Sequence, residues 1–403
     1  MFAKCGTSLG ASVALRGSVG QYLSVRTFTE SKRGLAMGII RKALSSRPVA
    51  SLTSPYTIDH YLDQIHPMLA AENVRARVVE VIQETGDAST VVLRPNGVWK
   101  GFTPGQHVQF GIEVDGKRRV RVFSVSSSQV GGRKAGKKGV FSVSVKAHPD
   151  GYVSQFLHRE LTPGTLVHLS QAEGDFVLPR VVPDNLLLMS GGSGITPVMS
   201  MVRTLRDSGH TGQVTFLHYA RSRDDEMFTN QLDELAATPN LTIQRVYTRQ
   251  PEPGADLQGR FTIDHLKHLG VDPASTLTYV CGPAGLIATV RDTYTELGAA
   301  EQLRLEYFKV PSVDLDAADA TGMLSFDDSK MEAFNSGATI LEQAEAAGLK
   351  PDFGCRMGVC NTCALKKNSG AVRHVVSGEI SANTDETIKI CVQVPIGDVN
   401  VAL

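Results

Sequence analysis

The sequence predicts a multi-domain protein: an antiparallel β-barrel, a doubly wound parallel α/β domain and a compact C-terminal domain. Three observations predict this order. Short β-rich runs, several of them alternating polar with apolar residues, follow one another from residue 74 to about residue 180, as half-buried antiparallel strands do. Continuous apolar strands then alternate with amphipathic helices, which indicates a parallel sheet covered on both faces. Four of the six cysteines crowd into the last fifty residues.

Composition limits the class of protein. A chain of 403 residues suggests about two to four domains, and 42% hydrophobic with 20% charged residues is a globular composition. Lys plus Arg equals Asp plus Glu, 41 each, which disfavours a polyanion-binding protein, so no nucleic-acid partner is expected. The longest apolar stretches, such as residues 186–189, are too short to span a membrane. We therefore expect a soluble, cytoplasmic protein without a transmembrane segment.

Residues 1–73 are predicted to be a leader and an N-terminal extension. Residues 1–36 hold five Lys or Arg against one acid, with Ser and small residues between, as organellar transit peptides do. The interpretation we favour is that Met37 is the true start, and organellar targeting stays open. Residues 56–69, YTIDHYLDQIHPML, have apolar and aromatic residues at helical spacing.

The barrel is predicted over residues 74–182. Its runs are bounded by Gly, Pro, Asp or Asn, as β-strands in a barrel or a sandwich are. They read VRARVVEVIQET, STVVLRP, QHVQFGIEV, RRVRVFSVSS and GVFSVSVKA.

The α/β domain is predicted over residues 183–310. Strands and helices alternate there, and they read NLLLMSG, TPVMSMVRTLRDSG, QVTFLHYA, NQLDELAA, LTIQRVYT, TIDHLKHL, TLTYVCG and PAGLIATVRDTYTELG. An acidic linker is expected at 311–321 and a third domain at 322–403, with one clear helix at TILEQAEAAG.

The strongest motif is FGCRMGVCNTC at 353–363. Four residues separate Cys355 from Cys360, two separate Cys360 from Cys363, and Cys391 follows later, which is the spacing of a plant-type [2Fe–2S] site. The alternative is a structural zinc site, but such sites usually pair two C-x-x-C knuckles, and only one is present. The pattern therefore predicts an iron–sulfur cluster in a reducing compartment.

A second motif is the glycine-rich turn in LLLMSGGSGITPVMSMV at 186–202. A buried strand is predicted to run into this turn, and a helix opens directly after it. Glycines let the chain approach a pyrophosphate, and a helix N-terminus offers N–H groups to it. Because the spacing is not G-x-G-x-x-G, a plain turn is the alternative. The residues concerned are Gly191, Gly192, Gly194, Thr196 and Pro197.

Two further motifs add to this. Cys281-Gly282-Pro283 ends a later strand of the same predicted sheet, so it is expected at the same ligand-binding edge, although Cys281 would also serve as a small buried hydrophobe. Arg121-Val122-Phe123-Ser124 on a barrel strand, with Gly151-Tyr152-Val153-Ser154 ahead of a helix, offers an Arg and a second helix start for phosphate.

These motifs in this order resemble the ferredoxin–NADP reductase superfamily, specifically its three-domain members with a C-terminal plant-type ferredoxin domain. The resemblance covers about residues 74–403. It implies an antiparallel barrel that binds flavin, an α/β domain that binds nicotinamide and a β-grasp ferredoxin-like domain. In that family R-x-Y-S and G-x-V-S hold the flavin and its phosphates, which implies roles here for Arg121, Phe123, Ser124, Gly151, Val153 and Ser154. Phe123 departs from the family tyrosine.

The same resemblance implies the nicotinamide site. In the family, G-G-x-G-x-T-P cradles the dinucleotide, which corresponds to residues 191–197 here. C-G-P at 281–283 would lie beside the nicotinamide, and E-x-F, matched by Glu306 and Phe308, would flank the flavin. Cys281, Glu306 and Phe308 are thus the predicted catalytic residues.

The resemblance implies FAD, with FMN as the alternative. Arg221 and Arg223 follow the strand QVTFLHYA, where arginine favours the 2′-phosphate of NADPH. Two acids, Asp224 and Asp225, come next, and NADH stays the alternative.

The implied function is electron transfer from NADPH through FAD and the [2Fe–2S] cluster to a partner protein, because flavin converts hydride into single electrons. The domain order and the lead-in at 56–69 resemble reductases of bacterial fatty-acid desaturases, which would allow peripheral contact with a membrane partner. The alternatives are the reductase component of a multicomponent oxygenase and a redox sensor that does not turn over.

A protein that begins at Met37 is expected to retain its flavin and its NADPH oxidation, because residues 1–36 show no helix or strand period. Flavin absorbance and NADPH consumption of the shortened protein check this. Loss of either would make the upstream segment part of the fold.

Overall fold

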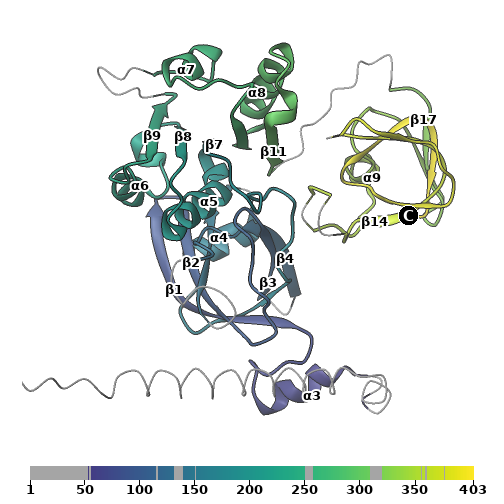
Figure 1. Ribbon diagram of the computed structural model, residues 1–403. Coiled ribbons are helices and arrows are strands. Elements are labelled where there is room, and N and C mark those ends of the chain that lie inside the picture. Colours follow the sequence, from purple (N-terminus) through teal and green to yellow (C-terminus); the bar gives the residue numbers. More distant parts are fainter. Residues whose placement is uncertain are drawn as a thin grey trace, which may run out of the picture. The chain divides into compact units, whose positions relative to one another are not determined.

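The computed structural model describes residues 53, 56–114, 117–130, 139–149, 151–249, 257–308, 320–354, 356–358, 361–375 and 377–403 (Figure 1). The chain divides into two units, Met1–Glu72 and Asn73–Leu403. The predicted leader at 1–36 and most of the predicted linker lie outside the described residues. Within the described ranges, no helix has both the length and the hydrophobicity needed to cross a bilayer.

In the first unit, the helix predicted within residues 56–69 is confirmed as α3, Ile58–Ile65. Its one buried side chain is Asp59. The Asp59 carboxylate accepts hydrogen bonds from the backbone N–H groups of Ala71, at 2.5 Å, and Glu72, at 3.3 Å. The helix is therefore tied to the segment that follows it.

A six-stranded antiparallel sheet begins the second unit, in the order β4-β3-β6-β1-β2-β5. Val125, just after β4, pairs with Val143 in β5, so the two edges meet and the sheet closes into the barrel. Inside, Trp99 stacks on Phe141 with ring centroids 4.7 Å apart. The elements are β1 (Val74–Thr85), β2 (Ala88–Pro95), β3 (His107–Val114), β4 (Lys117–Ser124), β5 (Phe141–Lys146), α4 (Tyr152–Arg159) and β6 (Leu166–Leu169).

The second sheet is parallel, with the order β11-β10-β7-β8-β9, as predicted. Alternate residues of its strands point to opposite faces, because side chains in a strand have a period of two. Leu188 and Phe216 pack with α5 and α6 on one face, whereas Leu187 and Leu217 pack with α7 and α8 on the other. The elements are β7 (Asn185–Gly191), η1 (Gly192–Gly194), α5 (Ile195–Ser208), β8 (Gln213–Ala220), η2 (Arg223–Asp225), α6 (Thr229–Leu235), β9 (Leu241–Tyr247), α7 (Ile263–His268), β10 (Leu277–Gly282), α8 (Ala284–Glu296), η3 (Ala300–Gln302) and β11 (Leu303–Tyr307).

The C-terminal domain is a mixed sheet in the order β13-β12-β17-β14-β15, with β16 paired to β14. Its first and last strands, β12 and β17, run parallel, as in the predicted β-grasp. The predicted helix begins with a capping box, in which Thr339 and Glu342 each accept a hydrogen bond from the other's backbone N–H. The elements are β12 (Met323–Phe326), β13 (Met331–Phe334), α9 (Ile340–Ala346), β14 (Ala364–His374), β15 (Ile380–Ser381), β16 (Glu386–Lys389) and β17 (Gln393–Val401).

Candidate cofactor sites

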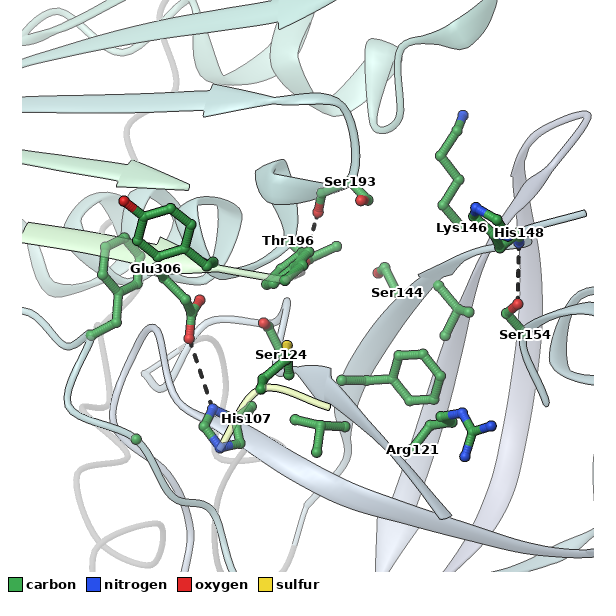
Figure 2. A pocket seen from close by; sticks show the side chains of 18 of the residues that line it. His107, Arg121, Ser124, Ser144, Lys146, His148, Ser154, Ser193, Thr196 and Glu306 are labelled. Atoms are coloured by element: carbon green, nitrogen blue, oxygen red, sulfur yellow. Dashed lines mark hydrogen bonds and ion pairs between the residues drawn. The ribbon is translucent and has the colours of Figure 1, made fainter. Parts of the chain in front are cut away.

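One cavity of about 750 Å³ receives side chains from the barrel and from the parallel sheet, with Met357 from the C-terminal domain. Figure 2 shows Arg121, Lys146, His148 and Ser154 toward one end of it and His107 and Glu306 toward the other. The predicted residues that line it are Arg121, Phe123, Ser124, Gly151, Val153, Ser154, Thr196, Glu306 and Phe308. The structure thus brings together motifs that lie up to 187 residues apart in the sequence, from Arg121 to Phe308.

At the barrel end, the GYVS segment forms the start of α4, with Gly151 as its N-cap. The Ser154 hydroxyl accepts from the His148 backbone N–H at 3.1 Å, and it donates to the Gly151 carbonyl at 2.9 Å. A side chain on Gly151 would place its Cβ 2.4 Å from the Ser154 oxygen. A side chain at 151 would therefore displace the Ser154 hydroxyl where this helix N-terminus, a favourable place for phosphate, meets the cavity.

Phe123 lines the cavity from β4 and also packs edge-on against Phe110, with centroids 5.9 Å apart. The ring that replaces the family tyrosine is thus anchored by the barrel core. It presents an apolar surface to the cavity and no hydroxyl.

The glycine turn lies against the second predicted loop of the same sheet. Gly194 is so close to β10 that a Cβ would sit 2.2 Å from the Cys281 carbonyl oxygen, and a Cβ on Gly191 would sit 2.9 Å from Pro283. Thr196, whose hydroxyl donates to the Ser193 carbonyl at 3.1 Å, extends this turn into the cavity. The other predicted residues of the two loops do not line the cavity: Gly191, Gly192, Gly194, Pro197, Cys281, Gly282 and Pro283.

Glu306 connects the two domains at the end of the cavity. One of its carboxylate oxygens lies 3.8 Å from His107 Nδ1, and the other accepts from the Cys281 thiol at 3.9 Å. Burial raises the pKa of Glu306, although His107 and Cys281 oppose this by hydrogen bonding to the carboxylate. Burial, reinforced by the neighbouring carboxylate, also raises the pKa of the Cys281 thiol well above its ordinary value. The thiol is therefore neutral near pH 7 and donates to the Glu306 carboxylate.

Arg221 and Arg223 do not line the cavity. They lie just beyond β8, about half exposed, and each faces an acid. Arg221 Nη2 donates to Asp225 at 2.7 Å, and Arg223 Nη2 lies 3.7 Å from Asp233. The two arginines thus form an exposed, acid-paired group at the carboxyl edge of the sheet.

Of the four predicted metal ligands, Cys363 and Cys391 belong to the described residues, whereas Cys355 and Cys360 lie outside them. The Sγ atoms of Cys363 and Cys391 are 3.1 Å apart and both residues are buried. Arg356, Gly358 and Asn361 have φ values of 56°, 77° and 56°, which lie in the left-handed region and mark tight turns in the chain before Cys363. A thiol at the end of this loop and a second thiol just after β16, with their sulfurs 3.1 Å apart, fit an iron–sulfur cluster.

Sequence reasoning missed several residues of the cavity. The sequence places His107 in a predicted strand and gives no sign of a further role. Lys146 ends β5 and His148 follows it, and the sequence of this strand contains no motif. Ser144 and Lys146 are two residues apart on β5, so their side chains lie on the same face of the strand. This strand lies beside β4 only because the barrel closes. The missed polar lining residues include His107, Ser144, Lys146, His148, Asp175 and Ser193.

Comparison with known proteins assigns each domain. The family model described as oxidoreductase FAD-binding domain matches residues 76–178, and the oxidoreductase NAD-binding domain matches residues 188–292. The model of the 2Fe-2S iron-sulfur cluster binding domain matches residues 325–393.

Relatives match over nearly the whole chain. An "NADPH oxidoreductase" of Mycobacterium tuberculosis is 34% identical over 87% of this chain and 89% of its own length. The glycine betaine monooxygenase reductase subunit of Chromohalobacter salexigens is 30% identical over 79% of this chain and 92% of its own. Among solved structures, phthalate dioxygenase reductase shares the fold, with a TM-score of 0.55 at 20% identity over 82% of this chain and 98% of that one.

Fold and site together define a flavin-dependent reductase with an iron–sulfur domain. The chain belongs to the ferredoxin–NADP reductase superfamily, among the members that combine FAD-binding, NAD-binding and C-terminal [2Fe–2S] domains. It is an NAD(P)H-dependent oxidoreductase. A bound flavin would supply the conversion of a two-electron hydride into single electrons.

Gly194→Ala is expected to weaken nicotinamide dinucleotide binding by at least about tenfold, because its Cβ must displace the backbone of β10. Titration of NADP⁺ against flavin absorbance measures this. Gly192→Ala is the matched control: its φ of +54° costs about 1 kcal/mol, but its Cβ meets nothing within 4 Å. Equal effects of the two substitutions would contradict the prediction.

Proposed function

We propose that this protein is the reductase component of an oxygenase system, which takes a hydride from NADPH and delivers electrons one at a time to an oxygenase protein. The observation that carries this is the match, over 92% of its length, to a glycine betaine monooxygenase reductase subunit. A 3-ketosteroid-9-alpha-monooxygenase ferredoxin reductase component of Mycolicibacterium smegmatis, 28% identical over 96% of its length, supports it. These names favour the oxygenase alternative over the desaturase partner that the sequence analysis placed first.

We assign the residue roles as follows. Arg121 and the start of α4 would bind the flavin phosphates, because a guanidinium and helix N–H groups are the donors that phosphate prefers. Phe123 would pack against the flavin ring. The glycine turn at 191–197 and the loop at 281–283 would hold the nicotinamide dinucleotide, with Cys281, Glu306 and Phe308 at the reacting end.

The cluster would be carried by Cys355, Cys360, Cys363 and Cys391. The close approach of the Cys363 and Cys391 sulfurs supports this set. Since the cluster takes one electron at a time, this domain is the natural exit toward a partner protein.

Preference for NADPH is part of the proposal. Arg221 and Arg223 are the two cations beyond β8, and the Mycobacterium tuberculosis relative is named for NADPH. A 2′-phosphate would compete with Asp225 and Asp233 for these guanidinium groups, so the preference should be moderate.

The Arg221→Ala, Arg223→Ala double variant is expected to lose about tenfold or more in kcat/KM for NADPH and little for NADH, because each charge-assisted contact is worth about 1.5–3 kcal/mol. Steady-state ferricyanide reduction with each nucleotide measures the difference. An equal loss with both nucleotides would reject the arginines as the 2′-phosphate site.

The electron route is tested with Cys363→Ser, which should impair the cluster and leave hydride transfer to the flavin intact. Ferricyanide reduction, which draws on the flavin, is expected to persist, while NADPH-dependent reduction of cytochrome c collapses. Unchanged cytochrome c reduction would contradict the cluster as exit. A wild-type protein that reduces neither acceptor would be a sensor instead.

The partner class is tested by mixing the reduced wild-type protein with a glycine betaine monooxygenase oxygenase component, and separately with a fatty-acid desaturase in vesicles. Stopped-flow absorbance then reports reduction of each acceptor. Faster reduction of the oxygenase component supports the proposal, and faster reduction of the desaturase overturns it.

A further inference from the structure

The contact between His107 and Glu306 joins the barrel to the parallel sheet at the cavity. His107 begins β3, and Glu306 lies near the end of β11. Both side chains are largely buried, 8% and 15% exposed, and both line the cavity. Figure 2 shows the imidazole and the carboxylate pointing toward each other.

The imidazole is held in this place by its surroundings. The backbone of His107 exchanges hydrogen bonds with Glu173, at 2.9 Å in both directions. The next residue, Gly174, has a φ of +111°, and a Cβ there would lie 2.8 Å from His107 Cε1. Glycine at 174 thus leaves the space that the ring occupies.

Glu306 has two oxygens and two different neighbours. Cys281 approaches one oxygen with its thiol, and His107 approaches the other. The thiol stays neutral over the ordinary pH range because burial raises its pKa. Of these two neighbours, only His107 can add a positive charge beside the carboxylate. Asp175 also lines the cavity, and Arg121 and Lys146 lie toward its far end.

We propose that His107 is a positioning residue for Glu306, which holds the carboxylate in place and favours its charged form where the flavin and nicotinamide domains meet. This deepens the proposed function, because it rests on the nicotinamide binding next to Glu306. The oxidised nicotinamide ring is a cation, so a charged Glu306 stabilises it and the positive charge that develops as hydride leaves. An imidazole at 3.8 Å favours ionisation of the carboxylate.

A charged Glu306 attracts the cationic nicotinamide ring, so nucleotide affinity is expected to rise with pH. NADP⁺ is expected to bind more tightly above the pH at which Glu306 ionises. The contact with His107 opposes the effect of burial on the pKa of Glu306, so without the imidazole the carboxylate is expected to ionise at higher pH. In His107→Asn, which keeps a hydrogen-bond donor but removes the imidazole, the midpoint of the affinity change is expected to rise by about one pH unit or more.

The experiment titrates the flavin-loaded protein with NAD⁺ and NADP⁺ from about pH 5 to about pH 9, following flavin absorbance. NAD⁺ lacks the 2′-phosphate, so a pH dependence seen with both nucleotides does not come from titration of that phosphate. His168→Asn is the matched control, because His168 Nε2 lies 3.9 Å from Glu113 in the same barrel but does not line the cavity. It is expected to leave the midpoint unchanged.

A double-mutant cycle with Glu306→Gln decides whether His107 acts through Glu306. In the Glu306→Gln background, His107→Asn should have no further effect on the pH profile. The inference is overturned if His107→Asn leaves the wild-type profile unchanged, or if it alters the profile equally without Glu306. His107→Gln serves if the Asn variant loses flavin. No partner protein enters these measurements, so their failure is separate from failure of the oxygenase proposal.

Discussion

The close approach of Gly194 to the backbone of Cys281 is the constraint on which the nicotinamide side of the cavity depends. A Cβ at 194 would lie 2.2 Å from the Cys281 carbonyl oxygen, so the turn after β7 can pack on β10 only without a side chain. This contact places Thr196 at the cavity and leaves Cys281 facing Glu306 on the neighbouring strand. Loops from three strands of one parallel sheet thereby converge, as expected at the carboxyl edge of a doubly wound fold.

The barrel forms the other side of the cavity, and it does so because its sheet closes on itself. Because Val125 pairs with Val143, β4 and β5 become neighbours although they stand at opposite ends of the sheet order. Arg121 on β4 and Lys146 on β5 can then line one cavity. An open sandwich with the same strands would separate them.

Most of the fold could be predicted because the spacing of apolar and polar residues in each strand and helix is visible within a short stretch of sequence. The residues VRARVVEVIQET form β1 as predicted, and the TILEQAEAAG helix has its capping box in the sequence. β6 was missed because LVHL is only four residues long. His107 was missed for a different reason. Its role depends on a partner 199 residues away, at Glu306, and on the space left by Gly174, and neither contact leaves a local pattern.

The loop that precedes Cys363 has contacts in two directions, and this bears on how electrons leave. Met357 lines the cavity, whereas the adjacent Arg356 pairs with Glu345, at 3.0 Å, and stacks on Phe353, at 3.8 Å from the ring centre. The Arg356 contacts anchor the loop to its own domain at α9, so Met357 does not need to be held by the cavity. The contacts of Arg356 with Glu345 and Phe353 lie within the C-terminal domain, so they do not depend on the contact of Met357 with the flavin domain. Under the proposed function, a cluster held beside these residues would receive electrons on the side of Met357 and pass them to a partner protein, without a rearrangement of the Arg356 contacts.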